Sequence, residues 1–129
     1  MTRIAKFFGL GLLSMLLIGP CFAAKPVANN GTLVVLTANW CATCREIIPA
    51  VQRAATSLGD LPVVTLDVDN GGTPEQANQY GVSISGSDIP EVYFVKGGKT
   101  TMVFNGRGYR FGHADQVQNQ IQQEVQSGL

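Results

Sequence analysis

Apolar and polar residues are grouped along this chain in a way that predicts first a strand and then a helix. Leu33 to Thr37 is an uncharged run of apolar and β-branched residues, which is typical of a strand buried on both faces. Further on, apolar residues recur at helical spacing, at Ile47, Ile48, Val51, Ala54, Ala55 and Leu58. This spacing predicts an amphipathic helix that begins near residue 41. Gly59 and Pro62 are typical of the end of such a helix.

A second strand and a short helix follow in the pattern. Val63 to Val68 is predicted as a second buried strand, and we expect it to run parallel to the first strand because a helix connects the two. Thr73 is predicted as the N-cap of the next helix, with Pro74 at its first position. Asp67 and Asp69 are interpreted as the solvated end of the second strand.

The last third of the chain predicts a hairpin and a final helix. Two strand-like segments, Glu91 to Lys96 and Thr100 to Asn105, flank a glycine-rich turn. From Ala114 onward the apolar residues are spaced by four, at Val117, Ile121 and Val125. They predict a helix that packs one narrow side on the sheet and exposes a Gln-rich face. The order of these elements predicts an α/β domain with a central mixed β-sheet flanked by helices.

A basic and then apolar N-terminus predicts export. Phe7 to Gly19 carries no charge and follows Arg3 and Lys6, as in a signal peptide, and it is short for a membrane span. We expect cleavage after Ala23, so that residues 1–23 are the signal peptide. Residues 24–31 would then form a short linker and 32–129 the folded domain, in a periplasmic or extracellular protein.

Two alternatives to cleavage stay open. An uncleaved N-terminal segment would anchor the chain in the membrane, and this is the only case in which we expect a membrane association. Acylation of Cys21 is less favoured, because it needs a small residue where Pro20 stands.

Cleavage would change the charge and the cysteine count. The whole chain has nine Lys and Arg, nine Asp and Glu, and three cysteines. Without residues 1–23, seven basic residues face nine acidic ones, a net charge of −2, and only Cys41 and Cys44 remain. A weakly acidic domain without a basic run gives no reason to expect nucleic acid as a partner. Disulfides, in contrast, are formed and exchanged in exported compartments.

Cys41 and Cys44 carry the candidate chemistry. The N–H groups and dipole at the start of the predicted helix stabilise a thiolate at Cys41, and Cys44 lies close enough to attack a mixed disulfide formed there. A structural disulfide is disfavoured because a two-residue loop removes little chain entropy. A zinc site needs four ligands, and His113 is far away in sequence. A haem attachment would need His in place of Arg45.

The segment Trp40-Cys41-Ala42-Thr43-Cys44-Arg45, with the strand before it and Ile89-Pro90 further on, resembles the thioredoxin superfamily. The resemblance covers roughly residues 32–129. It implies a thioredoxin-like fold, trimmed at its N-terminus, and a protein-disulfide oxidoreductase with Cys41 and Cys44 as catalytic residues. It also implies a cis bond between Ile89 and Pro90, which lie against the cysteines and bind the substrate segment. Trp40 would form a partly exposed wall beside Cys41.

The same resemblance implies the partners and cofactors. The partners would be client proteins with thiols or disulfides and a redox partner protein. We expect no cofactor other than the redox-active disulfide Cys41–Cys44.

Several positions depart from the family pattern. Val35 stands where the family has a buried Asp that accepts the proton of the second thiol, and Thr65 replaces the Lys that partners this Asp. Ala42 and Thr43 replace the Gly-Pro between the cysteines and are expected to tune the redox potential.

Glu91 is a further candidate for tuning the potential. It directly follows Pro90 and is expected to place a negative charge near the groove, which would oppose a Cys41 thiolate. The sequence therefore favours a reductant or an isomerase-like role over a strong oxidant.

Two other functions stay open for the same fold. The dithiol could bind a soft metal such as Cu(I), although Met102 and His113 lie in distant segments. The domain could also be a non-catalytic interaction module with a permanently oxidised pair.

Overall fold

The computed structural model describes residues 30–84 and 88–128. Seven elements follow one another in these ranges: β1 (Thr32–Thr37), α1 (Ala42–Ser57), β2 (Val63–Asp67), α2 (Thr73–Gln79), β3 (Glu91–Lys96), β4 (Lys99–Asn105) and α3 (Ala114–Ser127). The predicted signal peptide and most of the predicted linker lie outside the described residues. In the part that is described, none of the helices combines the length and the apolar character that a membrane crossing needs.

The four strands form one mixed sheet in the order β2-β1-β3-β4. β1 is parallel to β2, because α1 crosses over between them, and antiparallel to β3. β3 and β4 form the expected antiparallel hairpin. The central residues of β1, from Leu33 to Leu36, have no exposed surface, as the uncharged run predicts.

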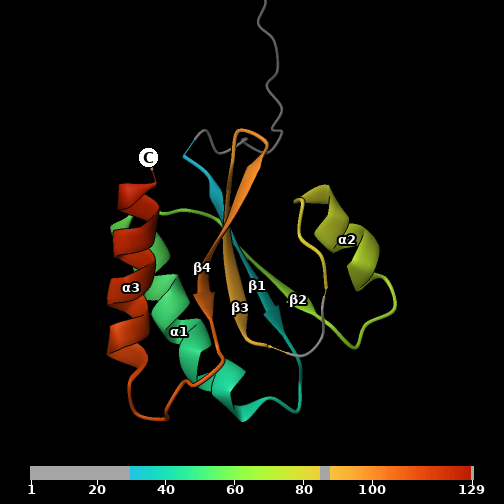
Figure 1. Cartoon of the computed structure of the whole chain (residues 1–129), viewed down its shortest axis with the longest axis horizontal. Helices are drawn as coiled ribbons and strands as arrows, with labels where there is room; N and C mark the ends of the chain where they lie inside the picture. Colours follow the sequence, from blue (N-terminus) through green and yellow to red (C-terminus); the bar gives the residue numbers. More distant parts are fainter. Residues whose placement is uncertain (1–29, 85–87, 129) are drawn as a thin grey trace, which may run out of the picture.

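Helices cover both faces of this sheet (Figure 1). α1 and α3 pack side by side on one face and α2 packs on the other. Successive residues of β1 point to opposite faces of the sheet and belong to two hydrophobic cores. Val35 packs with the α1 and α3 side chains, whereas Val34 and Leu36 pack with Ala77 of α2. The α/β class, the mixed sheet and the order of elements agree with the sequence-based prediction.

The predicted face of α3 is confirmed, and the predicted start of α2 is wrong by one residue. Val117, Ile121 and Val125 are the buried residues of α3. Thr73 is the first residue of α2 rather than its N-cap, and Gly72 takes the N-cap position without a side-chain hydrogen bond. The Thr73 hydroxyl instead donates to the carbonyl oxygen of Asp67, 2.5 Å away, and so fixes α2 to the end of β2.

The chain enters β3 through a cis peptide bond between Ile89 and Pro90, as predicted. Pro90 is fully buried, and its carbonyl oxygen accepts the N–H of Gly106, at 2.8 Å, where the chain leaves β4. Gly106 packs so closely on Pro90 that a Cβ at this position would lie 2.9 Å from the Pro90 nitrogen and would also overlap its ring. Glycine is therefore required here by space.

A second contact joins the loop after β4 to α1. The Glu46 carboxylate accepts the Tyr109 hydroxyl at 2.5 Å and the Gly112 N–H at 2.9 Å. The Tyr109 hydroxyl, and then the Gly112 N–H, hold the pKa of Glu46 below its ordinary value of 4.5, and nearby His113 acts in the same direction. Burial, followed by the Glu46 hydrogen bond and charge, raises the pKa of Tyr109 to about 12. We call this three-residue contact of Glu46, Tyr109 and Gly112 the α1 clasp.

Replacing Gly106 by Ala tests the close packing on Pro90. We expect Gly106→Ala to lower the free energy of unfolding by about 1–3 kcal/mol, because the added methyl group has no space. Gly71→Ala is the matched control, since a Cβ there meets no atom within 4 Å. Urea denaturation measures both variants. Equal stability of the two would contradict the packing argument.

Replacing Tyr109 by Phe tests the α1 clasp through pH. The depressed pKa of Glu46 stabilises the fold above its ordinary value of 4.5, and this stabilisation disappears as the pH falls through the lower folded-state value. We therefore expect Tyr109→Phe to be less stable than the wild type at pH 7 and to approach it at pH 3. Urea midpoints at the two pH values measure this, with Tyr80→Phe as the control. A pH-independent difference would argue against the clasp.

Candidate active site

Cys41 and Cys44 form a disulfide at the start of α1, with their Cα atoms 5.2 Å apart. After β1 the chain turns, and the Cys41 N–H donates to the carbonyl oxygen of Ala38. Cys41 has an extended backbone and is the N-cap residue of α1. Its Sγ accepts the N–H of Cys44 at 3.1 Å. An N–H group at a helix start thus points at the sulfur of Cys41, which is the arrangement that stabilises a thiolate.

The disulfide lies in an apolar environment. Cys41 is 6% exposed and Cys44 is 1% exposed, and both are buried together with Ala38. Val68 and Ile89 pack on this cluster from two different connections. Of the two sulfur-bearing residues, Cys41 is therefore the one nearer to solvent.

Trp40 directly precedes Cys41 and is 66% exposed, and its role as a wall of the binding surface stays a prediction. Its indole N–H donates to Oδ2 of Asp69 at 2.7 Å. The Asp69 N–H in turn donates to Oδ1 of Asp67 at 2.9 Å. The sequence interpretation gave both aspartates only a solvated role. The parallel pairing of β1 with β2 could have indicated this contact, because the ends of these strands meet at one edge of the sheet.

Ile89 lies against the disulfide, as the resemblance implied, whereas a contact of Pro90 with the cysteines stays a prediction. Ile89 packs on the disulfide cluster, and Pro90 is buried beside it in the chain. In the described part of the chain, the main-chain groups of Ile89 make no backbone hydrogen bond. Pairing of these groups with an extended polypeptide stays a prediction.

Glu91 is buried, with 3% of its surface exposed. Its Oε1 accepts the Tyr93 hydroxyl at 3.0 Å, and burial, together with this hydrogen bond and the charge of Glu91, raises the pKa of Tyr93 to about 12. The carboxyl group expected next to Pro90 therefore lies beneath the surface. Its effect on the redox potential stays a prediction, as does that of Ala42 and Thr43 in the first turn of α1.

Residues that sequence reasoning did not select also meet at this end of the sheet. Arg45 donates to the carbonyl oxygen of Asn39 at 2.8 Å and so braces the turn before the disulfide. Arg107 forms an ion pair with Asp88 at 3.0 Å, next to Ile89 in the chain. Among the described residues, no three His, Cys, Asp or Glu side chains come together as they would to bind a metal.

Comparison with known proteins gives a consistent result. The family profile described as Thioredoxin matches residues 22–123. A thioredoxin of Chlamydia muridarum is 33% identical over 76 residues, which are 59% of this chain and 69% of that protein. Thioredoxin H2 of Arabidopsis thaliana is 38% identical over 72 residues, 55% of this chain and half of that protein.

Solved structures support the fold. The crystal structure of thioredoxin from Trypanosoma brucei brucei superposes with a TM-score of 0.51 at 16% identity, and covers 76% of this chain and 77% of its own. At this identity the similarity concerns the fold alone. With the profile match, the sequence relatives and a disulfide at the start of α1, this chain belongs to the thioredoxin family of thiol–disulfide oxidoreductases.

Proposed function

We propose that this protein is an exported oxidoreductase that exchanges the Cys41–Cys44 pair with thiols or disulfides of client proteins. The observation that carries the proposal is the position of Cys41, whose Sγ accepts an N–H at the N-cap of α1 and which is more exposed than Cys44. In this arrangement Cys41 is the attacking residue and Cys44 the resolving one.

The exchange proceeds in two steps when the pair is reduced. The Cys41 thiolate attacks one sulfur of a client disulfide, a mixed disulfide forms, and the other client sulfur leaves as a thiolate. The Cys44 thiolate then attacks Sγ of Cys41, which releases the second client thiolate and forms the Cys41–Cys44 disulfide. The client gains two electrons, and a reduced partner protein must return two electrons to the pair. In the opposite direction the same steps oxidise a client.

Three residues would position the client. Trp40 offers an exposed apolar surface beside Cys41. Ile89 packs on the disulfide cluster, with Pro90 next to it in the chain, and the main chain of Ile89 can pair with an extended segment. Such pairing recognises the backbone, so it admits clients of many sequences.

A reductant or isomerase-like role is favoured over that of a strong oxidant. The sequence relatives of this chain are named thioredoxins, and one relative is a protein disulfide-isomerase of Neurospora crassa. The buried Glu91 carboxylate close in sequence to Ile89 would also oppose extra negative charge at the dithiol. Export rests on the apolar segment Phe7 to Gly19 and its basic flank.

Export is tested by the mass of the protein from its native host. We expect an intact chain that begins at Ala24, because signal peptidase cleaves after small residues such as Ala23. A full-length chain in the membrane fraction, or a lipid on Cys21, would contradict the proposal.

The roles of the two cysteines are tested by trapping. Cys44→Ser should accumulate mixed disulfides with client proteins, because the attack by Cys41 survives and the release step is lost. Cys41→Ser should accumulate almost none. Non-reducing electrophoresis followed by mass spectrometry of the trapped species measures both variants, with the double variant as the background control.

Two results would count against this assignment. Trapping by Cys41→Ser in place of Cys44→Ser would exchange the two roles. If neither variant traps a protein and the wild-type pair never turns over, the domain would instead be a binding or interaction module.

A further inference from the structure

The loop after β4 contains positive charge that the exchange reaction does not use. Residues 106–113 read Gly-Arg-Gly-Tyr-Arg-Phe-Gly-His, and we call them the basic loop. Its two ends are fixed, by Gly106 on Pro90 and by the α1 clasp. Between these ends Arg110 is exposed, and so is the ring of Phe111.

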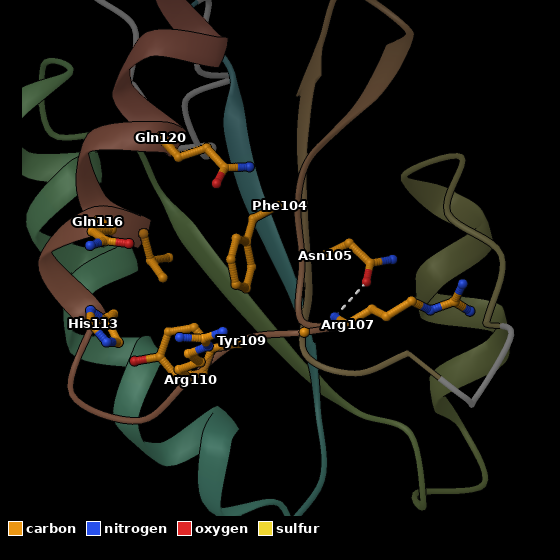
Figure 2. A pocket seen from close by; sticks show the side chains of 10 residues that line it. Phe104, Asn105, Arg107, Tyr109, Arg110, His113, Gln116 and Gln120 are labelled. Carbon is orange, nitrogen blue, oxygen red and sulfur yellow. Dashed lines mark hydrogen bonds between the residues drawn. The ribbon is translucent and has the colours of Figure 1, made fainter.

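A cavity of about 420 Å³ lies between this loop, β4 and the first turns of α3. Its floor is apolar and includes Phe104 and Val117, and its rim carries Arg110, His113 and Gln116. Figure 2 shows these rim residues grouped on the α3 side of Phe104, whereas Arg107 extends away on the other side of Asn105. None of the residues that line this basic pocket is acidic.

The carboxylates around the basic pocket already have partners. Glu46 accepts Tyr109 and Gly112, Asp88 is paired with Arg107, and Asp115 lies 3.7 Å from Arg53. In the part of the chain that the structure describes, Arg110 forms no ion pair. A cation and amide donors thus surround an open space that no side-chain anion of the described residues occupies.

The strand order of the sheet places the basic pocket on the β4 side of the disulfide. β2, β1 and β4 all end at the same edge of the sheet, in the spatial order β2-β1-β3-β4. Asp67 ends β2 and Asp69, which accepts the Trp40 indole N–H, follows it, whereas the disulfide follows β1 and the basic loop follows β4. The surface across the disulfide is therefore acidic on the β2 side and basic on the β4 side.

We propose that the basic pocket binds an acidic segment of the client polypeptide, a few residues from the client cysteine that reacts with Cys41. This inference rests on the proposed oxidoreductase function and specifies its substrates. A segment that pairs with Ile89 passes Gly106, where the basic loop begins, so its carboxylates can reach Arg110 while apolar side chains contact Phe104 or Phe111. The aspartates at the end of β2 would repel the same charges and so determine the orientation of the client.

The test compares two disulfide-bonded peptides that differ only in three residues on one side of the cysteine, Glu in one and Gln in the other. The reduced protein should reduce the Glu peptide faster than the Gln peptide, by about two- to five-fold for each client carboxylate that the pocket binds. This difference in rate should become smaller as salt is added. Arg110→Gln should bring the ratio of the two rates towards one. Lys99→Gln removes the same charge at the distant hairpin turn and should leave the ratio unchanged.

Each outcome decides the proposal. Equal rates for both peptides, or the same loss of preference in Lys99→Gln, would overturn acidic-segment docking and leave the oxidoreductase function intact. If neither peptide is reduced, the oxidoreductase function fails, and docking is then decided by binding of a cysteine-free Glu peptide to the oxidised protein. Binding that is lost in Arg110→Gln supports docking. Displacement of this peptide by succinate or phosphate at equal concentration would reveal a small-anion site and overturn it.

Discussion

Strand β1 is paired with β2 on one side and with β3 on the other, and its side chains from Leu33 to Leu36 are fully buried. These two pairings determine where the chemistry lies. Because β1 and β2 are parallel, α1 must begin where β1 ends, and Cys41 becomes its N-cap. Because β1 and β3 are antiparallel, β3 begins at the same edge, which brings Ile89 to the disulfide. Cys41 and Ile89 are 48 positions apart in sequence, and the parallel and antiparallel pairings of β1 bring them together at the site.

The hairpin of β3 and β4 brings the basic loop to the same end of the sheet. β4 returns to the edge where β3 began, so the basic loop emerges next to Pro90 and Gly106 packs on the proline. The α1 clasp then fixes this loop to the helix that bears the disulfide. The loop and α1 are therefore joined directly by a hydrogen-bonded carboxylate, in addition to their connection through the sheet.

The sequence predicted those parts of the structure that depend on local periodicity. The spacing of Val117, Ile121 and Val125 identified the buried face of α3, and the charge-free run identified β1. The cis bond before Pro90 followed from family resemblance. The α1 clasp was not predicted, because Glu46 and Tyr109 are 63 residues apart and the loop has no periodic pattern. The burial of Glu91 was also not predicted, because the extent to which the first residue of β3 is covered depends on its neighbours in the folded sheet.

The residues at this end of the sheet differ in how far they are buried. The disulfide is almost completely covered, so its reactivity depends on the local geometry at the start of α1. Trp40 and Phe111, in contrast, are exposed, and Arg110 is exposed as well. Exposed charges contribute little to affinity individually but steer encounter and fix orientation. In the proposed function, the exposed ends of β2 and β4 would select among clients, and the buried Cys41–Cys44 pair between them would exchange the electrons.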